Sequence, residues 1–434
     1  MPNHLFNYVK PNAEQTQAPP LNFFRFFLFL LTPLAYFCAM KYCLIRERKS
    51  PPDFRCPLNP EQALAFAKSN SNVSIWAESS AHRCFSDAEF LQQGIALAEG
   101  KPAQVYLGIK EVPPSALIPN STYFFFSHTI KRQPQNRELL QAVLQKNIRL
   151  IDYECLRDPQ GQRLIGFGFY AGVVGAYNTL RTFSLKTQQQ PLPHSAQLQS
   201  RTHMDQVLSE WSVPDLRIVL TGQGKVAQGA LSILKQLNFI QLEPHQVFPE
   251  TGRWVKIIDY HQYNVRIQDG GFDAAEFYAQ PQLYQARFLP FLSNAQILLT
   301  GHFWSADSPR FLSPEQLGST QILVVGDISC DVNGPLPCTL RPSTLQEPAY
   351  GWDKISFQET DLMKPSAIAV MAVDNLPAAL PADASNHFGT ALLPILQAFE
   401  KQPNAPVFEH ATIAQNGALM PKYAYLQAWV DGLE

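Results

Sequence analysis

Residues 217–230 read Arg-Ile-Val-Leu-Thr-Gly-Gln-Gly-Lys-Val-Ala-Gln-Gly-Ala, a short apolar run followed by a Gly-x-Gly-x-x-Ala turn and the start of a helical pattern. Gly222 allows a tight turn from strand to helix, Gly224 lets the backbone approach a pyrophosphate, and Ala227 keeps the helix close to the strand. Backbone N–H groups at the start of the helix would face the phosphates. The residues predicted to bind a dinucleotide cofactor here are Gly222, Gly224, Lys225, Val226 and Ala227.

The sequence after this turn contains the other parts of such a fold. An apolar helical face continues over residues 231–237, and Phe239–Leu242 has the pattern of a second strand. Glu243 follows that strand, about twenty residues after the first glycine, where a carboxylate is expected to bind the ribose. The alternative is an ordinary strand-turn-helix unit of small residues, since a glycine motif alone has low specificity.

The composition indicates a globular protein with a small-molecule ligand. The chain has 434 residues, of which 46% are hydrophobic and 16% charged, so it can bury a sizeable core. A chain of this length is expected to form about two or three domains. The formal net charge is -2, and the Lys and Arg residues are dispersed. A nucleic-acid-binding protein would carry a basic patch or stripe, so no nucleic-acid partner is expected.

The cysteines argue against a metal site. Seven are present, but they include no C-x-x-C pair and no zinc-like grouping with histidine, so no metal is predicted. Reduced thiols are typical of cytosolic proteins, and we expect a cytoplasmic location.

Residues 1–39 are expected to be an upstream extension outside the working protein. The apolar stretch Leu21–Met40 resembles a membrane or signal segment. Its uninterrupted part between Arg25 and Lys41 is shorter than the roughly 18 apolar residues that a spanning helix needs. Pro33 also interrupts it. A membrane anchor and a signal peptide are the alternatives for this segment, and no membrane partner is expected.

Short apolar runs alternate with helical patterns from Lys41 to about Gly166. The expected strands are Lys41–Arg46, Val73–Ala77, Gln104–Gly108, Thr122–Ser127 and Ile148–Ile151. The expected helices are Asn59–Ser69, Asp87–Ala98 and Asn136–Lys146. This alternation predicts a parallel sheet covered by helices on both faces.

The whole pattern predicts an α/β protein of two Rossmann-like domains with parallel sheets. The nucleotide-binding domain, residues 168–381, is expected to be inserted into a substrate domain formed by residues 40–167 and 382–434. A helix expected over Ser385–Glu400 begins the return to the substrate domain.

Charged groups directly follow two strands of the first domain. Lys110 follows the strand at 104–108, and His128 and Lys131 follow the strand at 122–127. The carboxyl ends of strands in an open α/β sheet border the ligand crevice. Lys110 and His128 are therefore suited to proton transfer on a substrate, although both could instead be loop residues in ordinary hydrogen bonds.

Other charged residues could bind a substrate with several carboxylates. Arg46, Arg55 and Arg163 lie near expected strand ends or turns. Guanidinium groups bind carboxylates through two hydrogen bonds, but each of these arginines could also be a solvated surface residue. Asp152 and Glu154 end a strand, and could hold a substrate ammonium, orient a catalytic side chain or form a structural ion pair.

Several longer segments resemble one enzyme family. They are Phe124–Lys131, Ile148–Glu154, Gly166–Gly172, Asp374–Pro381 and Pro421–Gln427. They are similar to the lysine-forming saccharopine dehydrogenases and lysine-ketoglutarate reductases, within the alanine dehydrogenase and transhydrogenase fold group, and among them to the reductase half of the bifunctional aminoadipate semialdehyde synthases. The resemblance covers nearly everything from Met40 onward. It implies an oxidoreductase that interconverts L-lysine plus 2-oxoglutarate with saccharopine, through imine formation and hydride transfer with NAD(P)H.

The resemblance also implies roles for single residues. The family's catalytic lysine and histidine fall on Lys110 and His128. Its substrate-binding residues fall on Arg46, Arg55, Lys131, Glu154, Arg163 and Asp374. One difference is Glu111, which follows the catalytic lysine as in the fungal NAD enzymes, whereas the reductase half typically has a basic residue there.

The cofactor is predicted to be NADP(H) or NAD(H). Glu243 would repel the 2'-phosphate of NADP if it faces the ribose. The resemblance to the reductase half implies NADPH instead, with Arg253 and Lys256 as sources of compensating charge. Asp327 ends a later strand and is predicted to line the cofactor crevice, whereas His302 is expected to be packed or at the surface. The alternative functions are an alanine-dehydrogenase-like enzyme and a non-catalytic nucleotide-binding protein.

Overall fold

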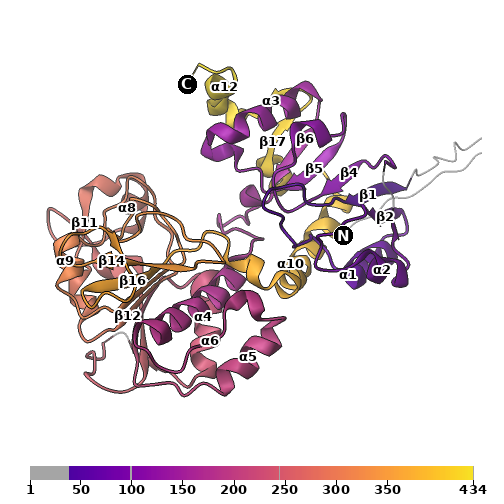
Figure 1. Cartoon of the computed structure of the whole chain (residues 1–434). Helices are drawn as coiled ribbons and strands as arrows, with labels where there is room; N and C mark the ends of the chain where they lie inside the picture. The colour runs from indigo at the N-terminus through magenta and orange to yellow at the C-terminus, as the bar shows by residue number, and fades with distance from the viewer. Residues whose placement is uncertain (1–38, 98–99, 244, 434) are drawn as a thin grey trace, which may run out of the picture. The chain divides into compact units, whose positions relative to one another are not determined.

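The computed structural model describes residues 39–97, 100–243 and 245–433. Within these residues the chain forms two eight-stranded sheets and a separate two-stranded ribbon (Figure 1). The predicted N-terminal extension lies outside the described residues, apart from Ala39. Among the described helices, none combines the length and the apolar character that crossing a membrane requires.

The first sheet has the strand order β18-β17-β6-β5-β4-β1-β2-β3. The strands from β1 to β6 pair in parallel, and β17 and β18 extend one edge as antiparallel strands. Its strands are β1 Met40–Leu44, β2 Val73–Ala77, β3 Ala96–Leu97, β4 Val105–Leu107, β5 Thr122–Phe125, β6 Arg149–Asp152, β17 Thr412–Gln415 and β18 Ala418–Leu419. The chain therefore leaves this sheet after β6 and returns to it near its C-terminal end.

The second sheet has the strand order β15-β14-β16-β13-β12-β7-β9-β8. Only β14 and β15 run antiparallel to their neighbours. Its strands are β7 Arg217–Thr221, β8 Ile240–Leu242, β9 Trp254–Ile258, β12 Ile297–Thr300, β13 Val324–Asp327, β14 Ala349–Asp353, β15 Glu359–Thr360 and β16 Ala367–Met371, and the ribbon consists of β10 Asn264–Arg266 and β11 Tyr284–Ala286. The prediction of an α/β protein with mostly parallel sheets is confirmed.

The strand beside β7 is β9, which comes later in the chain than the predicted second strand. The β8 strand forms where Phe239–Leu242 was predicted, but it pairs only with β9, at the edge of the sheet. Ile240 of β8 is 68% exposed, whereas four of the five residues of β9 are buried. A short, half-exposed strand suits an edge, and an apolar strand suits the interior of the sheet.

The helices are α1 Pro60–Ser69, α2 Asp87–Gln92, α3 Arg137–Gln145, α4 Gly168–Lys186, α5 Arg201–Ser209, α6 Lys225–Gln236, α7 Tyr260–Tyr263, α8 Ala274–Ala279, α9 Pro314–Gly318, α10 Pro381–Lys401, α11 Pro406–Ala411 and α12 Gln427–Val430.

The expectation of one helix over Asp87–Ala98 is wrong, because α2 ends at Gln92. Gly94 adopts a left-handed φ of 78°, and the N–H of Ile95 donates to the carbonyl of Phe90 at 2.9 Å. This Schellman-type end stops the helix and lets β3 join the sheet.

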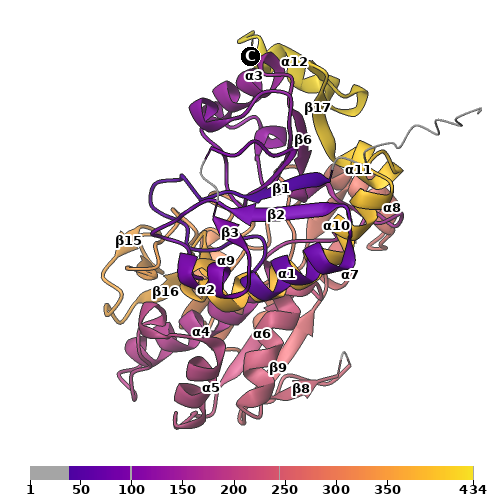
Figure 2. The same ribbon diagram turned by 90° about the vertical axis from the view of Figure 1, so that its right-hand side faces the viewer.

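The C-terminal part of the chain packs on the first sheet. One hydrophobic core contains residues of β1, β2, β4, β5 and β6 together with Phe388, Leu392 and Leu396 of α10. Helix α10 lies beside α1 (Figure 2). The Asn59 amide nitrogen donates to the Asn386 amide oxygen at 2.7 Å. The domain boundaries placed after residues 167 and 381 stay a prediction.

Two glycines allow α4 and α6 to cross in close contact. A Cβ on Gly172 of α4 would lie 1.9 Å from the carbonyl oxygen of Val226, and a Cβ on Gly229 of α6 would lie 1.9 Å from the carbonyl oxygen of Phe169. Both obstacles are backbone atoms, so no side-chain rotation can relieve them. The crossing therefore fixes the position of α6, the helix that begins at the glycine turn.

Candidate active site

The turn after β7 leaves open space next to its backbone. Gly222 has a φ of 85°, and a Cβ there would lie 2.7 Å from the carbonyl oxygen of Gly301. Gly224 is the N-cap of α6, and a Cβ on it would meet no atom within 4 Å. Gly222 is thus required by the shape of the turn itself, whereas Gly224 leaves room for a ligand over the first N–H groups of α6.

A cavity of about 1010 Å³ lies over this turn and is called the nucleotide cavity below. Gly222, Gly224, Lys225 and Val226 all line it. Ala227 does not, because its side chain is buried in the packing of α6. The remaining walls come mainly from the residues just after β9 and β12, the aromatic segment 260–278, the segment 302–311 and the hairpin 157–163.

Asp259 occupies the position that the sequence analysis gave to Glu243. It directly follows β9, the strand beside β7, and it lines the nucleotide cavity. Its carboxylate accepts a hydrogen bond of 2.9 Å from the N–H of Tyr260, which caps α7. Glu243 is exposed at the end of the edge strand β8 and is not among the residues that line the cavity. Asp259, and not Glu243, is therefore the carboxylate that follows the strand beside β7 and lines the nucleotide cavity.

Three more residues that the sequence linked to the cofactor are held elsewhere. Asp327 is fully buried and accepts hydrogen bonds of 2.6 Å from the hydroxyls of Thr300 and Thr339. Burial raises the pKa of Asp327 even though these hydrogen bonds oppose the rise. Arg253 and Lys256 donate to backbone carbonyl groups. None of the three is among the residues that line the nucleotide cavity, and each is bonded to strands or loops of the second sheet.

His302 is packed and also borders the nucleotide cavity. Its Nδ1 shares a hydrogen bond of 2.6 Å with the Thr221 hydroxyl, and its ring packs against Phe311 at 4.5 Å between centroids. Burial lowers the pKa of His302 to about 3, so the ring is neutral. Its buried Nε2 has no hydrogen-bond partner among the described residues.

A second cavity, of about 730 Å³, contains the predicted catalytic pair and is called the catalytic cavity below. Four of the predicted site residues, Lys110, His128, Lys131 and Asp374, line it. The other charged residues in its walls are Arg48, Lys49, Glu111, Glu138 and Asp331. Among the described residues, no group of three or more His, Cys, Asp or Glu side chains is arranged to hold a metal ion.

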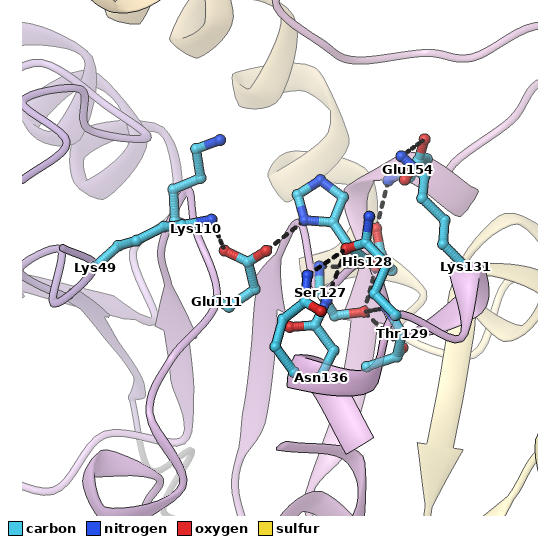
Figure 3. A network of polar contacts seen from close by, with 12 residues as sticks. Lys49, Lys110, Glu111, Ser127, His128, Thr129, Lys131, Asn136 and Glu154 are labelled. Carbon is cyan, nitrogen blue, oxygen red and sulfur yellow. Dashed lines mark hydrogen bonds and ion pairs between the residues drawn. The ribbon is translucent and has the colours of Figure 1, made fainter. Parts of the chain in front are cut away.

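His128 is held by Glu111. The Nδ1 of His128 lies 2.6 Å from Glu111 Oε1, and Lys49 Nζ lies 3.0 Å from Glu111 Oε2 (Figure 3). Burial alone would raise the pKa of Glu111, but the hydrogen bonds from His128 and Lys49 outweigh it and lower the pKa to about 2. An ionised Glu111 thus fixes Nδ1 as the bonded nitrogen and leaves Nε2 of His128 without a partner among the described residues.

The backbone before His128 is fixed by a buried carboxylate. Asp152 accepts from the N–H of Ser127 at 2.9 Å and from its hydroxyl at 2.5 Å. His128 itself has a left-handed φ of 52°, an uncommon conformation for a residue with a side chain. Of the roles proposed for Asp152, the structure therefore supports the one of orienting a neighbouring side chain.

Lys110 carries an amine that is suited to exchange protons. Burial lowers the pKa of Lys110, and the charges of Arg55 and Lys49 lower it further. Its side chain points away from Glu111 and makes no hydrogen bond or ion pair within the described part of the chain (Figure 3). Its backbone N–H donates to Glu47 at 2.9 Å, and burial raises the pKa of Glu47 to about 7. The sequence analysis missed both Glu47 and the orienting role of Glu111.

The remaining predicted substrate residues lie in three different places: in the buried interior, at the surface and between the two cavities. Arg55 is 3% exposed, binds Asp53 at 2.6 Å and Asn375 at 2.9 Å, and does not line either cavity. Arg46 is exposed and also lies outside both linings. Glu154 pairs with Arg163 at 2.5 Å and with Lys131 at 3.4 Å. Because Arg163 lines the nucleotide cavity and Lys131 the catalytic one, Glu154 connects the two.

Lys225 links the glycine turn to the chain at residues 163 and 164. Its ammonium donates to the carbonyl oxygens of Arg163 and Leu164, at 3.3 Å and 3.1 Å. Lys225 is also the first residue of α6, at the end of the glycine turn. A ligand on that turn would therefore lie next to the hairpin 157–163, whose Arg157 and Arg163 form a β-bridge.

Comparisons with known proteins found several similar enzymes. Residues 43–174 match the family described as alanine dehydrogenase/PNT, N-terminal domain. The chain is 30% identical to the mitochondrial alpha-aminoadipic semialdehyde synthase of Rattus norvegicus, over 88% of this chain and 47% of that protein. It is 26% identical to the saccharopine dehydrogenase (NAD(+), L-lysine-forming) of Schizosaccharomyces pombe, over 85% of this chain and 95% of that protein. The chain thus spans about half the length of the synthase and nearly all of the dehydrogenase.

Solved structures show the same fold. An L-alanine dehydrogenase superimposes with a TM-score of 0.62 and 15% identity, covering 91% of this chain and all of that chain. A transhydrogenase from Sinorhizobium meliloti gives a TM-score of 0.55 at 15% identity, over 88% of this chain and 99% of the other. These likenesses establish two Rossmann-type domains of the alanine dehydrogenase kind.

Proposed function

The chain is a homologue of alpha-aminoadipic semialdehyde synthases and of lysine-forming saccharopine dehydrogenases, and we propose that it interconverts L-lysine plus 2-oxoglutarate with saccharopine, using NAD(P)H. The observation that carries this proposal is the content of the catalytic cavity. His128, bound to the Glu111 carboxylate, and the Lys110 amine, which has no partner among the described residues, both line it together with several cationic side chains. The lysine-forming dehydrogenase is the better guide to the activity, because the alignment covers nearly all of it.

In the proposed reaction, the side-chain amine of lysine attacks the keto carbon of 2-oxoglutarate. Lys110, whose pKa is lowered by burial, accepts a proton from the attacking nitrogen. His128 delivers a proton through Nε2 to the oxygen that leaves as water, while Glu111 stabilises the charged ring from the other side. The resulting imine is reduced at the former keto carbon.

The cationic side chains explain how such a substrate could be held. Saccharopine carries three carboxylates, and Arg48, Lys49 and Lys131 line the same cavity as the acid-base pair. Each can bind a carboxylate by a charge-assisted hydrogen bond. Lys131 and Asp374 keep their predicted substrate role in this proposal, and Arg48 and Lys49 join them.

The nucleotide cavity fits a nicotinamide dinucleotide. Gly222, Gly224, Lys225 and Val226 would hold the pyrophosphate, because a Cβ at Gly224 would occupy otherwise empty space over the start of α6. The cofactor would supply hydride to the imine carbon. Asp259 would accept hydrogen bonds from the ribose hydroxyls and repel a 2'-phosphate, so the geometry favours NADH over NADPH.

Asp259→Asn should change the cofactor preference. The amide keeps the size and the capping oxygen of the aspartate but loses the charge that repels a 2'-phosphate. We expect kcat/KM for NADH, divided by kcat/KM for NADPH, to fall by about tenfold or more. A change of this size is what the loss of one charge-assisted hydrogen bond would cause. Glu243→Gln is the matched control, because it removes a carboxylate from the edge strand. If the ratio changes in Glu243→Gln and not in Asp259→Asn, the ribose-facing carboxylate is Glu243, as the sequence predicted.

Oxidation of NADH and of NADPH, measured separately, tests the proposed function. The chain should oxidise at least one of them with L-lysine plus 2-oxoglutarate, and mass spectrometry should identify saccharopine as the product. Ammonia plus pyruvate serves as the second substrate pair and tests the alanine-dehydrogenase-like alternative. Turnover of that pair alone, or of neither pair, would refute the proposal.

A further inference from the structure

We propose that Cys84 and Cys56 form a redox-active dithiol, in which Cys84 reacts first with a small disulfide and Cys56 then closes an internal disulfide with it. This modification site goes beyond the proposed function, because neither cysteine is among the residues that line the catalytic or the nucleotide cavity. Its test therefore does not depend on which reaction the chain catalyses.

The two cysteines lie on loops that follow neighbouring strands. Cys56 lies between β1 and α1, and Cys84 lies between β2 and α2. Strands β1 and β2 pair in parallel, so the two loops leave the same end of the sheet side by side. The Cys84 N–H donates to the carbonyl of Phe54 at 2.7 Å, which joins the two loops two residues before Cys56.

A buried serine of α10 lies against both cysteines. The hydroxyl oxygen of Ser385 accepts a hydrogen bond of 3.0 Å from the backbone N–H of Cys56, and the same oxygen lies 3.7 Å from the Cys84 sulfur. The Cys56 thiol lies 3.2 Å from the carbonyl oxygen of Leu58. The two thiols are themselves in hydrogen-bonding contact, and both are free in the structure. The sulfurs are thus neighbours before any bond forms between them.

Cys84 is the more reactive of the two thiols. The hydrogen bond from the Cys56 thiol lowers the pKa of Cys84 and the charge of Arg83 lowers it further, although burial opposes the change. Burial raises the pKa of Cys56 well above its usual value. The thiolate is the attacking form of a cysteine, and Cys84 is partly exposed whereas Cys56 is buried. Cys84 is therefore the attacking thiol and Cys56 the resolving thiol.

The reaction uses an external disulfide, such as glutathione disulfide, as its oxidant. The Cys84 thiolate attacks one sulfur of this reagent, the S–S bond breaks, and one small thiolate leaves. The Cys56 sulfur then attacks the Cys84 sulfur of the mixed disulfide, and the second small thiol leaves with the Cys56 proton. Overall, the two cysteines are oxidised by two electrons and one small disulfide is reduced to two thiols. An excess of a small thiol reverses both steps.

The four other cysteines in the described part of the chain are weak nucleophiles. Burial raises the pKa of Cys43 and of Cys330 to about 12, and that of Cys155 to about 11. Cys338 is fully buried, and burial raises its pKa as well. A disulfide reagent should therefore react selectively with the proposed pair.

Peptide mapping after mild oxidation tests the inference. The folded full chain is incubated with glutathione disulfide and alkylated, and its peptides are identified by mass spectrometry. The wild-type chain should yield a peptide that links Cys56 to Cys84, and excess glutathione should remove the link. In Cys56→Ser, Cys84 should carry glutathione instead. In Cys84→Ser, Cys56 should remain a free thiol, and thermal melting checks that both variants are folded.

Cys155→Ser is the matched control, because it removes another buried thiol from the same hydrophobic core region. It should form the linked peptide in wild-type yield. In the wild-type chain, iodoacetamide should alkylate Cys84 at least about tenfold faster than Cys155. The inference is overturned if the oxidised wild-type chain contains no linked peptide, if Cys84 and Cys155 are alkylated at equal rates, or if Cys56 takes up glutathione in Cys84→Ser. None of these outcomes bears on the proposed function, which is tested by turnover.

Discussion

Replacing His128 with glutamine is expected to lower kcat for lysine plus 2-oxoglutarate by about 10²- to 10⁴-fold, the usual contribution of a positioned acid or base. Glutamine keeps a polar group near Glu111 but cannot carry a proton to the leaving oxygen. Lys110→Met should cause a loss of the same order, because it removes the amine that accepts a proton from the attacking nitrogen. Steady-state rates with saturating NADH or NADPH measure both effects.

The loss should be confined to the chemical step. The KM for the cofactor should change little, because His128 and Lys110 line the catalytic cavity and not the nucleotide cavity. His410→Gln, at an exposed position in the last turn of α11, should retain wild-type kcat. The acid-base assignment fails if His128→Gln and Lys110→Met each leave kcat unchanged.

Gly172→Ala is expected to destabilise the protein by about 3 kcal/mol or more, at the upper end of the range for overpacked sites. The new methyl carbon would lie 1.9 Å from the Val226 carbonyl oxygen and 2.7 Å from the Ala230 nitrogen. Helices α4 and α6 would have to separate, and that movement would shift the glycine turn at the start of α6. Chemical denaturation followed by circular dichroism measures the change in the free energy of unfolding.

Gly168→Ala provides the control within the same helix. A Cβ there would meet Lys225 Cβ and Val226 Cγ2 at 3.4 Å, which is ordinary van der Waals contact. Its effect on the free energy of unfolding should be smaller than about 1 kcal/mol, and alanine in a helix favours stability. Equal stabilities for the two variants would show that the α4–α6 contact is not as close as described.

The local pattern was sufficient to predict most elements of the fold. The strand predicted at Val73–Ala77 forms with these bounds, and the helix predicted at Asn59–Ser69 begins one residue later with Asn59 as its cap. Apolar runs and capping residues act over a few positions along the chain, so the sequence reveals them. The error over Asp87–Ala98 arose because the left-handed conformation of Gly94 was not anticipated.

Part of the lining of the catalytic cavity could be predicted from the sequence. Lys110, His128 and Lys131 were found because residues at the carboxyl ends of neighbouring parallel strands meet at one edge of the sheet. The partner of His128 was not found, although Glu111 is adjacent to Lys110 in the sequence. Nothing along the chain shows that Glu111 turns toward a residue seventeen positions later, since the contact exists only when β4 and β5 lie side by side.

The sequence by itself determined that a glycine turn joins a strand to a helix at Gly222–Ala227 and that strands and helices alternate on both sides of it. Those properties depend on backbone conformation and on periodicity, which are local. Only the tertiary structure decided which carboxylate follows the strand beside β7. Because β8 lies at the edge of the sheet and β9 lies beside β7, that carboxylate is Asp259. It likewise decided that Arg55 binds Asp53 and that Asp331 enters the catalytic cavity. Strand order and long-range charge pairing are properties of the packed chain, and no spacing along the sequence contains them.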